Sequence, residues 1–325
     1  MNHLSEFFRL LLIIGNFSAK LKFQKRFALK MLEPLCEGLS DVEKQRIYKY
    51  GLYVPVFIGE SYSVLRGNKL SENERIAITC LGCMTGLFDD LFDENNYSDS
   101  FIRNLLENPV KNDSNSLNIN VLIDLYYLFL KNTPHSVSAK VQMLKIFDAQ
   151  AASRNQLSNP TLTRVALRTI TYNKGGFTMQ LYRRAFEGEI SENEDELYFK
   201  LGAIGQLEND IFDVYTDLQA GIKTLVNSTR NIKTIKSAYR NLHREIWKEI
   251  DKTNYINADK EAFKRIVSLI IARGFVALKQ LKSVSKKTKG IFKPLEYTRS
   301  ELICDMEKPL NRVKLLYYAV SCIKK

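Results

Sequence analysis

The chain is a succession of amphipathic stretches separated by short polar breaks. Apolar residues recur at three- and four-residue spacing, which is the period of a helix with one buried face. The stretches cover residues 41–66, 72–94, 118–132, 137–157, 161–187, 194–220, 230–252, 259–284 and 299–323. No segment alternates between apolar and polar residues in the manner of a strand. The pattern therefore predicts an all-α protein.

Helix start signals support these bounds. Three stretches begin with a serine that is followed three residues later by a glutamate, which is the capping-box arrangement. The pairs are Ser40 with Glu43, Ser71 with Glu74, and Ser191 with Glu194. The breaks are of loop length, with no internal repeat and no low-complexity linker. We therefore expect a single helical domain over residues 1–325, with N-terminal helices in 1–40 and a core in 70–220.

The composition limits the classes of partner. The 325 residues are 45% hydrophobic and 26% charged, an ordinary balance for a globular protein. The net charge of +12 would suit nucleic acid, an anionic membrane surface or a phosphorylated small molecule. No zinc-finger spacing, aromatic RNP-type segment or basic zipper is present, so we expect no nucleic-acid partner.

The N-terminal segment is apolar but short. Its uninterrupted apolar run covers only residues 10–15, whereas a membrane-spanning helix needs about 20 residues. The segment also lacks a basic leader region and a small-residue cleavage site, so we expect a cytoplasmic protein. The alternative is an amphipathic helix on a membrane surface, because Lys20, Lys22, Lys25 and Arg26 follow directly.

Two cysteines, Cys80 and Cys83, have CxxC spacing. A redox or zinc site would need a thioredoxin-like strand or a second pair of cysteines, and neither is present. We interpret them as small thiols packed inside a helix.

The first cluster of candidate site residues lies in "GLFDDLFDE", residues 86–94. Asp89 and Asp93 are four residues apart and share one helical face, with Asp90 and Glu94 one step around the helix. Like charges at this spacing destabilise a helix unless a cation lies between them. Oxygen ligands of this kind suit a hard divalent cation, above all Mg²⁺.

A second acidic row follows about 120 residues later in "QLENDIFDVYTD". Asn209, Asp213 and Asp217 recur every four residues, with Asp210 beside them. Two such rows on two helices could face each other across a cavity and hold several Mg²⁺ ions, whose open positions would suit diphosphate oxygens. The alternative interpretation is a pair of solvated helix ends.

Three cations lie between the rows and could contact a diphosphate: Arg164, Arg168 and Lys174. An ordinary charged helix face is the alternative. We expect the Gly175–Gly176 pair to break or bend the helix and to free backbone groups near a ligand.

Small residues precede both acidic rows on the same faces. We expect Gly82 and Thr85 before Asp89, and Gly202 and Gly205 before Asp213, to border an apolar hollow beneath the metal end. Aromatic residues would roof it, drawn from Phe88, Phe92, Phe177 and Phe212. An apolar tail with a diphosphate head would fit such a pocket.

These motifs resemble those of a known superfamily. "DDLFD" resembles the DDxxD motif of class I isoprenoid synthases, and "NDIFDVYTD" resembles the second metal motif of terpene synthases, (N/D)Dxx(S/T)xxxE. The second segment is also similar to the QLxNxxRDxxED stretch of squalene and phytoene synthases, with matches at Gln206, Leu207, Asn209, Asp213, Val214 and Asp217. Both motifs occur in the expected order within residues 70–220.

The departures bear on the subclass. Asp213 and Asp217 replace the usual Ser/Thr and Glu of the terpene synthase motif, and Phe212 replaces the arginine of the phytoene synthase stretch. No GKxxR precedes the first motif, as it does in head-to-tail chain elongators, although Arg66 and Lys69 lie near that place. The combination most resembles bacterial large-terpene synthases of the tetraprenyl-curcumene synthase type.

The resemblance implies a helical bundle around a central apolar cavity and a prenyl diphosphate substrate. It further implies three Mg²⁺ ions, held by the two rows, that assist departure of diphosphate and leave an allylic carbocation in an aromatic-lined pocket. No side chain need act as a nucleophile, so no catalytic residue is expected beyond the metal and diphosphate ligands. The basic segment "SVSKKTKGIFK", residues 283–293, is a solvated loop or, in this fold, could close over the diphosphate with Arg299 or Tyr297 contributing. A homodimer is plausible.

Three functions remain open at this point. The first is a terpene synthase that cyclises or eliminates from one diphosphate. The second is a prenyltransferase that joins two substrates head-to-tail or head-to-head. The third is a non-catalytic prenyl-lipid binder, against which the retention of every candidate Mg²⁺ ligand argues.

Overall fold

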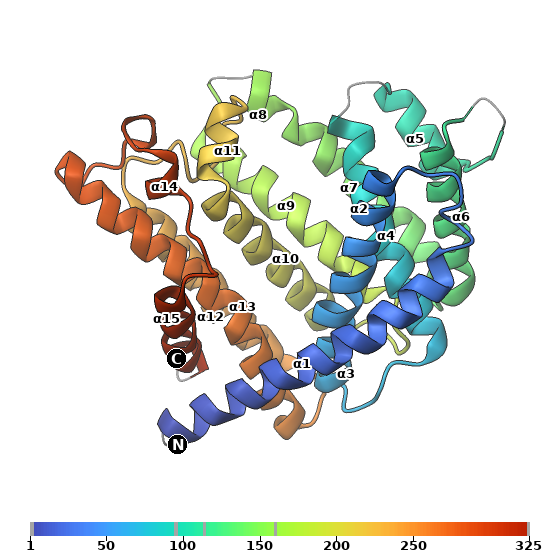
Figure 1. Cartoon of the computed structure of the whole chain (residues 1–325), viewed down its shortest axis with the longest axis horizontal. Helices are drawn as coiled ribbons and strands as arrows, with labels where there is room; N and C mark the ends of the chain where they lie inside the picture. The colour runs from blue at the N-terminus through green and yellow to red at the C-terminus, as the bar shows by residue number, and fades with distance from the viewer. Residues whose placement is uncertain (1–2, 94–96, 113–114, 159–160, 324–325) are drawn as a thin grey trace. The chain divides into compact units, whose positions relative to one another are not determined.

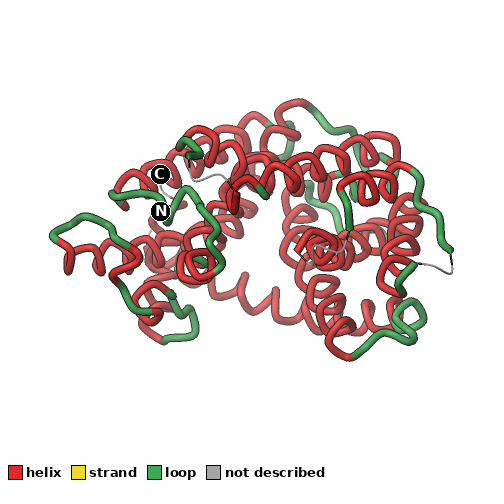
Figure 2. The backbone as a smooth tube through the Cα atoms, turned by 90° about the horizontal axis from the view of Figure 1, so that it is seen from above, coloured by secondary structure: helices red, strands yellow, loops and turns green. Residues whose placement is uncertain are grey.

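In the computed structural model, the described residues are 3–93, 97–112, 115–158 and 161–323. All of them lie in helices and connecting loops, and these ranges contain no strand (Figure 2). The predicted all-α class is therefore confirmed. No helix in the described ranges is long and apolar enough to cross a membrane.

The chain divides into two compact units, each assembled from separate segments. The N-terminal unit comprises Leu12–Ala151 and Gln180–Ile190, and the C-terminal unit comprises Met1–Leu11, Ala152–Met179 and Ser191–Lys325. Two helices, α1 (His3–Leu32) and α9 (Arg164–Arg183), contribute residues to both units. The expected single-domain organisation stays a prediction.

In the N-terminal unit, α4 (Glu72–Asp93) packs against α2 (Asp41–Val54) and α6 (Leu117–Asn132). The other elements of this unit are η1 (Pro55–Gly59), α3 (Glu60–Leu65), α5 (Asp99–Glu107) and α7 (Ser136–Ser153). Buried polar contacts tie α1 to this core, because the Gln24 amide nitrogen donates to the Gly51 carbonyl oxygen (3.1 Å) and the Thr79 hydroxyl (2.9 Å). The helix that carries the first acidic row is thus held from several sides.

In the C-terminal unit, α10 (Glu192–Phe212) packs against α12 (Ile232–Lys252) and α13 (Asn257–Val284), as Figure 1 shows. The remaining elements are α8 (Asn155–Ser158), α11 (Val214–Gln219), η2 (Ser285–Thr288), η3 (Pro294–Glu296), α14 (Arg299–Leu302) and α15 (Pro309–Ile323). The buried Tyr239 hydroxyl lies 3.1 Å from both the Glu208 carboxylate and the Ile271 carbonyl oxygen, which links three helices. The second acidic row is carried by this packed unit.

The expected helix break at Gly175–Gly176 is wrong, because α9 runs unbroken through both glycines. A Cβ on Gly175 would lie 2.1 Å from the Gly202 carbonyl oxygen, and one on Gly176 would lie 2.4 Å from the Phe199 ring. The glycines therefore allow α9 and α10 to approach closely.

We predict that Gly175→Ala destabilises the protein by about 1 to 3 kcal/mol, because the added methyl group collides with backbone that has little room to move. Gly205→Ala is the matched control. Gly205 lies on the facing helix α10 with no atom within 4 Å of an added Cβ, so the substitution should be neutral or slightly stabilising through helix propensity. Thermal unfolding of the two variants checks this, and equal stability would contradict the close contact.

Two predicted capping boxes are confirmed and the third is half formed. Ser40 and Ser71 each exchange hydrogen bonds with the glutamate three residues on. Ser191 accepts from the backbone nitrogen of Glu194, whose carboxylate accepts instead from the Tyr255 hydroxyl at 2.7 Å.

Other bounds differ from the pattern. The stretch 194–220 is interrupted at Asp213, and the stretch 299–323 divides into α14 and α15. Helix α5 was not predicted, because its nine residues are too few to establish a period. Cys80 and Cys83 are buried in α4, where burial raises the pKa of both thiols, so their interpretation as small thiols packed inside a helix is confirmed.

Candidate functional site

The second acidic row lies where α10 ends and α11 begins. Asp213 stands between the two helices, yet its backbone nitrogen donates to the Asn209 carbonyl oxygen (2.9 Å), and its own carbonyl oxygen accepts from the Asp217 nitrogen (2.8 Å). These bonds keep the helical spacing across the junction, so the three residues stay along one side of the chain. Asn209 is exposed, and Asp213 and Asp217 are half-buried.

Asp210 has a different role from its neighbours. Its two carboxylate oxygens accept hydrogen bonds from the Thr171 hydroxyl on α9 (2.9 Å) and from the Gln206 amide (3.1 Å). Its burial raises its pKa to about 6, against the opposing effect of these hydrogen bonds. Asp210 therefore joins α10 to α9 through bonds that a metal ligand would have to share.

The row concentrates negative charge in a partly dehydrated place. Burial, together with the charges of Asp210 and Asp213, raises the pKa of Asp217 to about 7. Burial also raises the pKa of Asp213, although a hydrogen bond with Asn209 opposes the change. Carboxylates that resist ionisation in this way would be stabilised by a cation beside them.

Lys174 supplies one positive charge near the row. It is half-buried on α9, close enough to lower the pKa of Asp210 and Asp217. The other two predicted cations of α9 are exposed: Arg164 begins the helix, and Arg168 lies near Tyr172. Of Arg164, Arg168 and Lys174, it is Lys174 that the described contacts place near the acidic row.

Two arginines far away in the sequence also approach this end of α10. The Arg299 guanidinium carbon lies 6.0 Å from the ring centroid of Tyr215, which stands between Asp213 and Asp217 in the chain. The Arg273 guanidinium carbon lies 5.3 Å from the ring centroid of Phe212. Arg299 was a sequence candidate, whereas no local pattern marks Arg273 because its partner lies about 60 residues earlier.

Tyr297, the other candidate beside the basic segment, is buried, and its hydroxyl already has hydrogen-bond partners. Its hydroxyl bonds with that of Thr288, donates to the Ile291 carbonyl oxygen (3.2 Å) and accepts from the Lys293 backbone nitrogen (3.1 Å). It therefore holds the loop together, so its suggested contact with diphosphate is withdrawn.

The first acidic row lies at the end of α4 in the N-terminal unit. Asp89 is half-buried and close enough to the buried Tyr182 hydroxyl to contribute to raising its pKa, an effect that burial dominates. Asp90 forms an ion pair with Arg46 of α2. Asp93 is the last residue of α4, and its side chain and the whole of Glu94 lie outside the described residues.

The small residues do not all border open space. A Cβ on Gly82 would lie 2.7 Å from the Tyr50 carbonyl oxygen, and one on Gly202 would lie 2.0 Å from the Gly175 carbonyl oxygen. Helices α2 and α9 thus pack closely against these two glycines, and the assignment of both residues to a pocket stays a prediction. Gly205 does have open space around it.

The polar and aromatic pocket candidates have identified neighbours. The Thr85 hydroxyl lies 2.7 Å from that of Tyr182 and donates to the Leu81 carbonyl oxygen (2.9 Å). Phe88 packs edge-to-face on Phe92, with ring centroids 5.2 Å apart. In the C-terminal unit, Phe177 packs on Phe199 at 5.6 Å.

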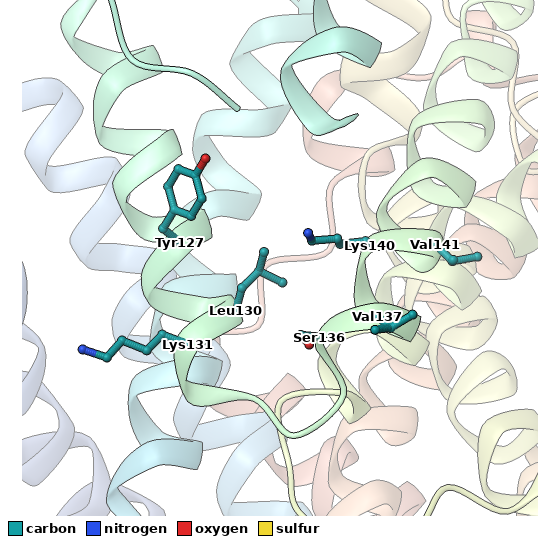
Figure 3. Close-up of a pocket in the computed structure, with 7 residues that line it drawn as sticks. All are labelled: Tyr127, Leu130, Lys131, Ser136, Val137, Lys140 and Val141. Carbon is teal, nitrogen blue, oxygen red and sulfur yellow. The ribbon is translucent and has the colours of Figure 1, made fainter. Parts of the chain in front are cut away.

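A separate cavity of about 570 Å³ lies between α6 and α7 (Figure 3). Tyr127, Leu130, Val137 and Val141 give it apolar walls, with Lys131 and Lys140 at its sides. It contains neither acidic row, so it is not the predicted pocket. The central apolar cavity stays a prediction.

The residues of the second row fit a magnesium ion chemically. Within the described residues, no group of three or more Asp, Glu, His or Cys side chains is arranged to hold a metal ion. Magnesium is commonly bound through one or two carboxylates together with water and substrate phosphates. Asp213 and Asp217 provide two such carboxylates, and Asn209 an amide oxygen, beside Lys174.

Comparisons with known proteins add no relative. No protein-family model and no curated protein sequence matches the chain.

Proposed function

We propose that this protein is a Mg²⁺-dependent class I isoprenoid synthase that ionises a prenyl diphosphate and releases a terpene product. One observation carries the proposal: the carboxylates of Asp213 and Asp217 are both half-buried, the charge of Asp213 helps to raise the pKa of Asp217, and Lys174 is the neighbouring cation. Carboxylates whose pKa is shifted strongly by burial and by neighbouring charges are concentrated at functional sites.

The acidic residues would bind Mg²⁺, and the cationic residues would bind the diphosphate. Asn209, Asp213 and Asp217 would hold Mg²⁺ at the second row, and Asp89 with Asp93 would hold Mg²⁺ at the first row. Bound Mg²⁺ supplies Lewis acidity toward a leaving diphosphate. Lys174 and Arg299 carry positive charge beside the second row and would bind diphosphate oxygens directly.

Aromatic side chains would contact the apolar chain of the substrate. Phe88 with Phe92, and Phe177 with Phe199, form aromatic pairs on the helices that carry or adjoin the motifs. An aromatic face attracts a passing cation by about 0.5 to 2 kcal/mol. Aromatic walls would also keep water from quenching the carbocation.

Product analysis tests this proposal against its alternatives. Purified protein is incubated with allylic diphosphates of C10 to C30 and Mg²⁺, with and without isopentenyl diphosphate. A hydrocarbon or terpene alcohol formed from one allylic substrate supports the proposal. A longer diphosphate formed only with isopentenyl diphosphate, or a head-to-head product, would replace it by a prenyltransferase. Binding without turnover of any substrate would contradict both enzymes.

The position of Thr85 leads to a prediction about chain length. Thr85 lies one turn before Asp89 on α4, so its side chain is expected to face the same side as the metal end. We predict that the wild type prefers chains of C20 or longer, and that Thr85→Phe shortens the accepted chain while Mg²⁺ dependence is unchanged.

Thr85→Val separates filled space from the lost hydrogen bond. Both substitutions remove the hydroxyl that lies 2.7 Å from the buried Tyr182 hydroxyl, but valine has nearly the size of threonine. Substrate preference measured for both variants should change only with phenylalanine. A wild type that prefers C10, or an equal change in both variants, would show that Thr85 does not border the substrate chain.

A further inference from the structure

A second cavity lies in the C-terminal unit, where α13 ends and α12 begins. Its volume is about 400 Å³. The side chains that give it its charge are Arg230, Lys233, Lys282 and Lys286, with Asn231 and the buried Ser285 between them. We call this the basic cavity. None of its residues belongs to either acidic row.

The four cations of the basic cavity have no acidic partner among the residues that the structure describes. No carboxylate in the described part of the chain forms an ion pair with Arg230, Lys233, Lys282 or Lys286. The nearby acids are already paired with other lysines, Glu301 with Lys287 and Glu296 with Lys293. The mutual repulsion of the four charges is therefore not offset within the unit.

Two of these cations also stand at an unfavourable end of a helix. Arg230 precedes the N-cap Asn231, and Lys233 lies in the first turn of α12, where the helix dipole is positive. An anion would be stabilised there by both the dipole and the side chains. The arrangement thus suits a negatively charged ligand on two electrostatic grounds.

The wall of the basic cavity is fixed by internal bonds. Lys289 and Gly290 both adopt left-handed backbone conformations, with φ of 55° and 85°, and the Gly290 nitrogen donates to the Ser285 carbonyl oxygen at 2.8 Å. The nitrogen of the buried Phe292 donates to the Arg230 carbonyl oxygen (2.8 Å), which joins this turn to the start of α12. The cations are thus carried on backbone that is already ordered, which reduces the entropy cost of binding.

We propose that the basic cavity binds an anion that carries two adjacent phosphoryl groups. Four positive charges exceed what a single phosphate requires, and two phosphoryl groups match them closely. No aromatic residue is among those that line the cavity, so recognition rests on charge and not on stacking of a base. The same chemistry is offered by free diphosphate and by the headgroup of a bisphosphorylated inositol lipid.

Binding of inorganic diphosphate in the presence of a chelator tests the proposal by calorimetry. Without a divalent cation, the acidic rows repel diphosphate, which isolates the basic cavity from the proposed active site. The test variant is Lys233→Gln with Lys286→Gln, and we expect its affinity to fall about tenfold or more. The control is Arg244→Gln with Lys248→Gln, which removes the same charge from exposed positions of α12.

A parallel measurement uses phosphatidylcholine vesicles that contain phosphatidylinositol bisphosphate. Binding of either probe that is lost in the test variant and kept in the control supports the proposal, and the probe that binds more tightly identifies the source of the phosphoryl groups. Absence of binding to both probes, or an equal loss in test and control variants, would overturn it. Thermal unfolding of both variants verifies that they are folded.

Discussion

Replacing Asp213 by alanine is expected to lower turnover by about a thousandfold or more while the helical content is unchanged. Metal ions contribute several kcal/mol to charge stabilisation in a transition state, and each 1.36 kcal/mol is a factor of about ten in rate. Asp213 is half-buried at the α10–α11 junction, where its side chain belongs to the acidic row and not to the hydrophobic core.

Asp89→Ala should have the same effect from the other acidic motif. The control is Glu192→Ala, which removes an exposed acid from the first turn of α10, at the opposite end from the row. Turnover is measured as diphosphate release, and circular dichroism verifies the fold. Near-normal turnover in Asp213→Ala or in Asp89→Ala would remove that row from the metal site.

Asp217→Asn is expected to have two opposite effects, a large loss of turnover and a gain in stability without metal. The pKa of Asp217 is raised from 3.8 to about 7 by burial and by the neighbouring Asp210 and Asp213. The folded state therefore binds this proton more tightly than the unfolded state does. The resulting stability is fully present below pH 4 and is lost as the pH rises through 7.

Asparagine carries no charge to ionise, so the variant keeps this stability at high pH. In chelator at pH 8 we expect its free energy of unfolding to exceed that of the wild type by about 1 kcal/mol or more, after the pKa shift is discounted for solvent screening. The advantage should vanish below pH 4.

Magnesium should reverse the order of stability. Added Mg²⁺ binds the ionised row of the wild type and raises its unfolding temperature at pH 8, with little effect on the variant. Thermal unfolding at several pH values, with and without Mg²⁺, checks all three expectations, and Glu192→Gln serves as the charge-matched control. A variant that is less stable than the wild type in chelator at every pH would contradict the account of this carboxylate.

Local signals in the sequence predicted the helices well. Two of these signals are the serine caps at positions 40, 71 and 191 and the apolar spacing. Both depend only on residues that are close in the sequence, so they can be recognised without the three-dimensional structure. The interruption at Asp213 and the division between α14 and α15 are not, because short irregular turns leave the apolar spacing nearly unchanged.

The roles of the glycines could not be predicted from spacing alone. A glycine in a helical stretch is compatible with a break, a cavity wall or a close helix contact. Gly175 has the third role because Gly202 stands opposite it, 27 residues later in the chain. Gly82 is covered by α2 in the same way.

For the site residues too, local spacing could be predicted from the sequence and contacts between helices could not. The four-residue spacing of Asn209, Asp213 and Asp217 is local and is retained in the structure. The hydrogen bond from Thr171 to Asp210 and the ion pair of Asp90 with Arg46 join separate helices, so no local sequence motif predicts them. Which cation approaches the row is likewise a matter of packing, which brings Lys174 close and leaves Arg164 exposed.

The central claim is that the acidic rows make this protein a metal-dependent diphosphate-releasing enzyme. The most direct test measures diphosphate release from a long allylic diphosphate by the wild type, by Asp213→Ala and by Asp89→Ala, with Mg²⁺ or with excess chelator. The account predicts release only by the wild type and only with Mg²⁺. Equal release in chelator, or no release from any chain length with Mg²⁺ present, would contradict it.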